Sequence, residues 1–305
     1  MKVTIRLLGF GLLLAAAFGV AAVAGSSVDV KRGHSTHHAD QMSAMNSMSA
    51  MSSDTHSHAA SSTSSMSGMA MSVGGLPQGL SVEEENVRLV PATTTFPLGR
   101  TADYRFRILD GHGRVVRDFQ VEHAKKLHLI VVRRDFAFYQ HVHPTMAADG
   151  TWSIPLRLGA AGVYRVFADF QASGAENTIL ATDLFVAGDF QPQAVPAPVT
   201  RTTVDGYDVA LRGAPRAGSE GMLEFTVTRA GQPVKVQPYL DADGHLVALR
   251  QGDLAYLHVH PQEKPGHGGP IVFMAEYPSV GTYRLFLQFK AAGAIHTAEF
   301  TQEVR

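Results

Sequence analysis

The chain of 305 residues contains no cysteine and a single tryptophan. Without cysteine it can form neither disulfide bonds nor a blue-copper centre, which needs a thiolate ligand. A folded part without disulfides must bury a core that is large enough by itself. The formal net charge is −1, and the basic residues form no run. We therefore expect no nucleic acid among the partners of this protein.

The first residues follow the pattern of a secretory signal. Two basic residues precede an apolar run at 7–23, and the small residues AVAG at 22–25 offer a cleavage site after Ala24. We assign residues 1–24 to a signal peptide and expect an extracytoplasmic protein, periplasmic or secreted, with no membrane insertion after cleavage. An uncleaved anchor stays open as the alternative, because the run is nearly long enough to span a bilayer.

Residues 25–78 are rich in Ser, Met, Ala and His and poor in branched or aromatic side chains. Such a segment buries too little apolar surface to offset the entropy of ordering, so we predict a disordered tail. Thioethers are soft ligands that select Cu(I), which favours a copper collector over the alternative, a low-complexity linker with chance methionines. The candidate tail ligands are seven of the eleven methionines: Met42, Met45, Met48, Met51, Met66, Met69 and Met71.

Beyond the tail, short apolar runs rich in Val, Ile, Phe and Tyr alternate with turn signals such as DGHGR at 110–114. This spacing is typical of an all-β sandwich, and no helix of useful length is evident. The proline-rich composition of residues 189–200 predicts a linker. We predict two tandem β-sandwich domains, 79–188 and 201–305, that fold independently of each other.

The two predicted domains are copies of one another. HLIVVRRDFAFYQHVHP at 128–144 aligns without a gap with HLVALRQGDLAYLHVHP at 245–261, and eight of the seventeen positions agree, including three histidines and the final proline. GVYRVFADF at 162–170 matches GTYRLFLQF at 281–289 at Gly, Tyr, Arg and both Phe. A duplicated domain explains both matches.

The duplicated histidines are the candidate metal ligands. In His-x-His-Pro the two histidines lie on one face of a strand. A tight turn at 134–136 would place His128 across from His143 and Ile130 across from His141, so that three imidazoles share a face with Cβ atoms about 5 Å apart. That spacing suits one ion with bonds of about 2.0 to 2.1 Å. The candidates are His128, His141 and His143 in the first copy and His245, His258 and His260 in the second.

Two points on this site stay open. Asp169 is a candidate fourth ligand of the first copy, and its counterpart in the second is Gln288. Histidines at strand ends can instead serve as hydrogen-bonding groups of the fold, which would also preserve them in both copies. His123 has no partner in the other copy, so the pattern indicates an ordinary surface residue.

The stretch 128–144, the DGTW turn at 149–152 and the stretch 162–170 resemble the secreted bacterial proteins of the YtkA-like or CopC-like family, which are often associated with heavy-metal handling. The resemblance covers both halves. It implies two tandem immunoglobulin-like β-sandwich domains with an extracytoplasmic binding role. CopC-like proteins bind Cu(II) through a histidine at the mature N-terminus, whereas cleavage here leaves Gly25, so that site is not carried over.

No motif of a hydrolase, metalloprotease or phosphate-binding enzyme occurs, so we expect no enzyme. The expected function is binding of a transition-metal ion, copper first with zinc or another metal open, for buffering, resistance or delivery to an envelope transporter or chaperone. The alternative is a non-metal structural or interaction module of the cell envelope.

Overall fold

The computed structural model of the protein describes residues 77–257, 259–262 and 269–305. The predicted signal segment, nearly all of the predicted tail with its seven methionines, and His258 lie outside these residues. All twenty elements of the described part are β-strands. No helix in that part is long and apolar enough to cross a membrane.

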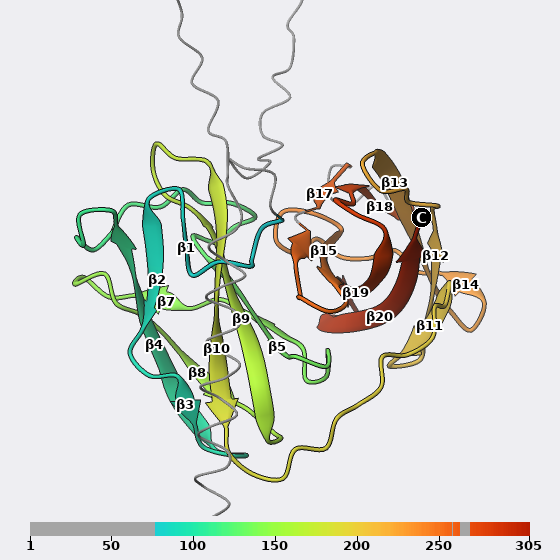
Figure 1. The fold of residues 1–305 in the computed structure, drawn as a ribbon. Helices are drawn as coiled ribbons and strands as arrows, with labels where there is room; N and C mark the ends of the chain where they lie inside the picture. Colours follow the sequence, from blue (N-terminus) through green and yellow to red (C-terminus); the bar gives the residue numbers. More distant parts are fainter. Residues whose placement is uncertain (1–76, 258, 263–268) are drawn as a thin grey trace, which may run out of the picture. The chain divides into compact units, whose positions relative to one another are not determined.

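The first repeat forms two mostly antiparallel sheets, drawn from blue to yellow in Figure 1. Their strand orders are β1-β2-β4-β8-β7 and β3-β10-β9-β5-β6. The strands are β1 (Glu83–Glu84), β2 (Val87–Pro91), β3 (Thr95–Phe96), β4 (Thr101–Asp110), β5 (His128–Arg133), β6 (Gln140–Val142), β7 (Thr145–Met146), β8 (Trp152–Arg157), β9 (Gly162–Gln171) and β10 (Asn177–Val186).

The second repeat forms a second pair of sheets, drawn from yellow to red in Figure 1. The orders are β11-β12-β13-β18-β17, with β14 paired to β13, and β16-β15-β19-β20. The strands are β11 (Arg201–Val204), β12 (Tyr207–Arg212), β13 (Glu220–Arg229), β14 (Gln232–Pro233), β15 (Gly244–Arg250), β16 (Tyr256–Leu257), β17 (His260–Pro261), β18 (Ile271–Glu276), β19 (Gly281–Ala291) and β20 (Ala294–Val304). The prediction of an all-β chain with two repeated sandwiches is confirmed.

The repeated Gly-x-Tyr-Arg sequence opens the equivalent strands β9 and β19. The Tyr164 hydroxyl donates a hydrogen bond of 2.9 Å to the carbonyl of Ala160, four residues upstream. The Tyr283 hydroxyl donates one of 3.1 Å to the carbonyl of Ser279, also four residues upstream. This arrangement is the tyrosine corner of immunoglobulin-like sandwiches, which explains why both copies kept the tyrosine.

Strand β5 is buried along its whole length, because both of its faces are covered. Leu129 and Val131 point into the core between the two sheets of the first repeat. Ile130 and Val132 alternate with them and join a different hydrophobic cluster. Successive side chains of a strand point to opposite faces, so a continuous apolar run is what a strand covered on both sides requires.

That further cluster is shared by the two repeats. It gathers side chains from β5, β9 and β10 of the first repeat and from β15, β16 and β19 of the second, among them Phe167, Phe286 and Tyr256. Tyr139 stacks on Phe286 with ring centres 4.1 Å apart, and Phe167 lies 5.3 Å from Tyr256. Tyr139 aligns with Tyr256 and Phe167 with Phe286. The contact is therefore reciprocal, like that between the subunits of a two-fold symmetric dimer.

The shared cluster bears on the prediction of independent folding. No strand lies between Val186 and Arg201, as the proline-rich sequence suggests. This segment is nevertheless attached to the first repeat, since the amide of Gln193 donates to the Asp135 carboxylate over 2.8 Å. Each repeat has its own core, yet a separated repeat would expose its part of the shared cluster to water. We therefore expect the two repeats to unfold as a coupled pair.

Candidate metal centre

The histidine motifs lie on strands in the predicted register. Strand β5 pairs antiparallel with β6 through Leu129–Val142 and Ile130–His141, as the tight-turn expectation requires. In the second repeat, β15 pairs with β16 through Ala248–Leu257, the equivalent register. A one-residue slip would have moved His128 to the opposite face.

Three histidines of the first repeat meet at the end of this hairpin. The Nδ1 atom of His128 lies 3.0 Å from Nε2 of His141 and 3.2 Å from Nε2 of His143. One ligand atom from each of the three lies within 4.8 Å of the others. The side chains of His128 and His141 are buried, with exposed fractions of 3% and 9%. We call His128, His141 and His143 the histidine triad.

The outer nitrogens of two triad rings have acceptors as partners. Nε2 of His128 lies 3.0 Å from the carbonyl oxygen of Glu122, and Nδ1 of His141 lies 2.8 Å from Oε1 of Gln288. The Gln288 amide nitrogen donates to the Thr297 hydroxyl over 3.3 Å, which is consistent with this orientation of the amide. An oxygen acceptor requires the ring nitrogen to carry the proton.

The tautomers that follow leave lone pairs facing each other. With protons on their outer nitrogens, neutral His128 and His141 present unprotonated nitrogens to one another across 3.0 Å. Two acceptors cannot hydrogen-bond to each other. A proton on Nε2 of His143, 3.2 Å from Nδ1 of His128, satisfies only one of the two nitrogens, whereas a shared proton or a cation satisfies both. Histidines that bind metals almost always donate their other ring N–H to a carbonyl or carboxylate, which is the arrangement seen here.

The electrostatic environment disfavours the shared proton. Burial, together with the neighbouring His128 and His143, lowers the pKa of His141 to about 3. Burial, His128 and Lys125 lower the pKa of His143 to about 4. Near neutral pH these two rings are therefore neutral, which is the form that coordinates a metal ion.

Histidines from outside the triad lie against it. The ring of His245, on β15 of the second repeat, stacks on His128 with ring centres 5.3 Å apart and planes 8° apart. Its centre lies 4.4 Å from that of His141. The ring of His123 lies 6.2 Å from His128 and 6.1 Å from His245. His123 is not duplicated, so self-comparison of the sequence gave no signal for it.

Of the second-copy candidates, His245 is the one whose side chain the structure describes. His245 was expected to group with His258 and His260, and it lies with the triad of the first copy. The backbone of His260 begins β17 and pairs with Met274 of β18, in the other sheet of the second repeat. His258 is outside the described residues.

Asp169 lies beside the triad without belonging to it. It pairs with His128 across strands β9 and β5, is 3% exposed, and accepts a hydrogen bond of 2.9 Å from the Asn177 amide. Its charge acts to raise the pKa of His141. The equivalent position in the second copy, Gln288, contacts His141 directly. Both copies thus place a polar side chain of this position close to the histidines.

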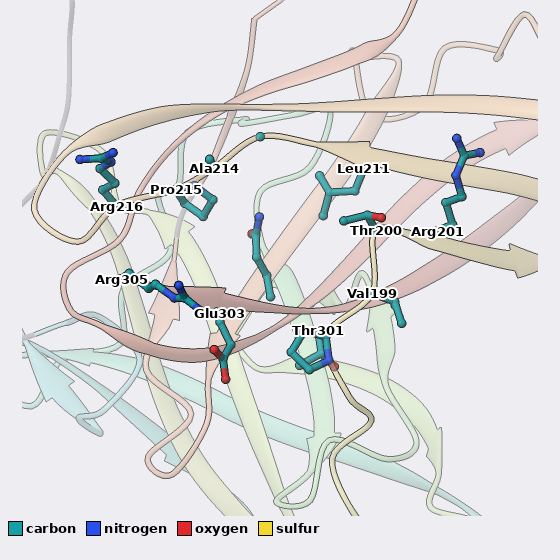
Figure 2. Close-up of a pocket in the computed structure, with 13 residues that line it drawn as sticks. Val199, Thr200, Arg201, Leu211, Ala214, Pro215, Arg216, Thr301, Glu303 and Arg305 are labelled. Atoms are coloured by element: carbon teal, nitrogen blue, oxygen red, sulfur yellow. The ribbon is translucent and has the colours of Figure 1, made fainter.

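A separate surface groove of about 950 Å³ lies in the second repeat (Figure 2). It is lined by the ends of the linker and of β20, and its charged residues are exposed: Arg201, Arg216, Glu303 and Arg305. None of the triad histidines lines it. Charged groups so exposed are well solvated, so this groove offers no chemistry comparable to the triad.

Comparison with protein families gave a match on both repeats. The model described as Domain of unknown function (DUF8832) matches residues 81–183 and again 202–305. The match does not carry the YtkA-like or CopC-like name that the motifs suggested. No curated protein matched the chain.

The solved structures that match the chain are distant in sequence. A Salmonella alpha-2-macroglobulin reacted with methylamine is 15% identical, with 75% of this chain and 15% of that chain covered and a TM-score of 0.27. The Escherichia coli adhesin FdeC is 15% identical, with coverages of 72% and 64% and a TM-score of 0.24. The Yersinia pseudotuberculosis adhesin InvE is 12% identical, with coverages of 71% and 58% and a TM-score of 0.22. The chain spans less than two thirds of each of these, and we derive no function from them.

Proposed function

The chain belongs to the family described as Domain of unknown function (DUF8832), and we propose from its own site that it binds a transition-metal ion through His128, His141 and His143. The observation that supports this most is the pair of ring nitrogens that face each other with lone pairs while their outer N–H groups are held by oxygen acceptors. A bound cation would convert this repulsive contact into two coordination bonds.

The ligand type limits the metal. The triad offers three imidazoles and no oxygen ligand, which suits copper, zinc or nickel rather than calcium or magnesium. Copper ranks first because of the methionine-rich sequence at 42–71. We propose a non-enzymatic protein outside the cytoplasm that buffers the metal or passes it to a transporter or chaperone of the envelope.

The triad is tested by metal content. The full chain is loaded with Zn²⁺ or Cu²⁺, desalted and measured by mass spectrometry, beside a variant carrying His141→Ala and His143→Ala. We expect the variant to lose about one metal equivalent, because two of three ligands are gone. His112→Ala, which removes an exposed histidine of the turn at 110–114, is the matched control and should keep the metal. Equal metal content in all three proteins would overturn the proposal.

The preference for copper has its own test in the tail. A peptide of residues 34–72 should compete for Cu(I) with a chelator of moderate strength. A peptide with all seven methionines changed to leucine should lose most of this capacity, because leucine keeps the bulk but has no sulfur lone pair. Equal competition by the two peptides would contradict the role of the tail in copper capture.

A structural or interaction module is the second candidate, and the shared cluster favours it. The hydrogen bond from His141 to Gln288 already joins the two repeats without a metal ion. If the triad serves only this purpose, the His141 and His143 variant loses stability, by about 1 kcal/mol for each broken hydrogen bond, and its metal content is unchanged. The metal measurement above therefore separates the two functions.

A further inference from the structure

We infer that His245 of the second repeat is the fourth ligand, so that one ion is held jointly by both repeats and its binding locks them together. This inference rests on the proposed function, and it concerns which residues complete the site. The sequence had assigned one site to each domain. The contacts of His245 with His128 and His141 point to a single shared site.

Ring positions fit four imidazoles around one ion. With metal–nitrogen bonds of about 2.0 to 2.1 Å and tetrahedral geometry, the centres of four coordinated rings lie about 5 Å from one another. Within the triad the ring centres are 5.3, 4.9 and 4.7 Å apart. His245 lies 5.3 Å from His128 and 4.4 Å from His141. These five separations are close to the expected value.

The internal symmetry explains why His245 lies there. His128 and His245 are equivalent residues of the two copies, and they stack on each other with planes 8° apart. A residue that meets its own counterpart lies at the axis of a two-fold contact. The reciprocal contacts of Tyr139 with Phe286 and of Phe167 with Tyr256 belong to the same arrangement. Metal sites shared across a symmetric contact draw ligands from both halves in this way.

Rigid strands hold the two sides. His128 begins β5, whose outward residues Ile130 and Val132 belong to the shared cluster, and His245 is on β15, whose Val247 and Leu249 belong to it as well. The strand pair β15–β19 also comes very close at Gly244, where an added Cβ would lie 2.9 Å from the carbonyl oxygen of Gln288. Ligands on such elements are well positioned before the ion arrives.

The experiment measures Zn²⁺ affinity by competition with a chelator in the full chain. His245→Phe keeps an aromatic ring but removes the ligand nitrogens, and we expect it to weaken Zn²⁺ binding at least tenfold. Phe286→Ala leaves every proposed ligand in place but loosens the contact between the repeats, so it should also weaken binding. Phe185→Ala, an exposed phenylalanine of the first repeat, is the control and should bind as the wild type does.

The outcomes separate the inference from the proposed function. If His245→Phe and Phe286→Ala both keep the wild-type affinity while the His141 and His143 variant loses it, the triad alone is the site and the shared site is refuted. If the wild-type chain binds neither Zn²⁺ nor Cu²⁺, the proposed function fails, and the inference fails with it. Weakening by His245→Phe and Phe286→Ala, with Phe185→Ala unchanged, supports the shared site.

Discussion

Replacing Phe286 with alanine is expected to lower the free energy of unfolding of the metal-free chain by about 3 to 5 kcal/mol. The Phe286 side chain is fully buried in the cluster shared by the two repeats, and its ring stacks on Tyr139 at 4.1 Å. Removing the ring leaves a cavity at the contact between the two repeats. The loss should therefore appear as weaker coupling between the repeats as well as lower stability.

The chain offers a convenient probe for this coupling. Its single tryptophan, Trp152, is buried in the core of the first repeat, so tryptophan fluorescence reports on that repeat alone. Far-ultraviolet circular dichroism reports on both repeats. In urea, the two signals of the wild type should change together, and those of Phe286→Ala should separate.

The exposed Phe185 supplies the control for this measurement. Its side chain is 49% exposed, so Phe185→Ala should change the free energy of unfolding by about 1 kcal/mol or less and leave the two signals coincident. Coincident signals in Phe286→Ala together with an unchanged urea midpoint would show that the repeats do not contact each other through this face in solution.

Much of each repeat could be predicted from the sequence because the patterns involved are local. The turn after β5 and the shared face of His141 and His143 predicted the register, since a slip by one residue would move His128 to the opposite face of the hairpin. The tyrosines of the two Gly-x-Tyr-Arg sequences were conspicuous because both copies kept them, and each closes the same corner. These features depend on contacts within one repeat.

The contact between the repeats could not be predicted in the same way. Ile130 and Val132 show that the outward face of β5 is covered, but an apolar pattern does not say what covers it. The neighbours of His245 depend on how the two repeats contact each other. A residue-by-residue comparison of the copies could therefore not predict them. His123 belongs to an irregular segment with a left-handed backbone, φ 49°, and no repeat or strand pattern applies to it.

The metal-free chain is expected to lose stability as the pH falls from 7 to 5. In the folded protein the pKa of His141 is lowered to about 3 by burial and by the neighbouring histidines, whereas the unfolded chain has an ordinary histidine pKa of about 6.5. Below about pH 6.5 the unfolded chain therefore binds a proton that the folded chain does not. The stabilisation is complete above the unfolded pKa and is lost progressively as the pH falls below it.

The expected loss due to His141 between pH 7 and pH 5 is about 2 kcal/mol. His143, with a pKa lowered to about 4, acts in the same direction and by a similar amount, because its folded pKa also lies below this window. Carboxylates with lowered pKa, such as Asp135 and Asp149, titrate below this window and contribute little to it. Urea unfolding at several pH values, in the presence of a chelator, measures the loss.

The variant that isolates this effect is His141→Gln, whose side-chain amide can still donate a hydrogen bond to Gln288 but does not titrate. It should flatten the dependence of stability on pH between 7 and 5 by about 2 kcal/mol, while His112→Ala should leave the dependence as in the wild type. An equally steep dependence in His141→Gln would mean that the His141 ring is protonated in the folded chain. In that case a shared proton, rather than a metal ion, would satisfy the nitrogens of His128 and His141 that face each other across 3.0 Å.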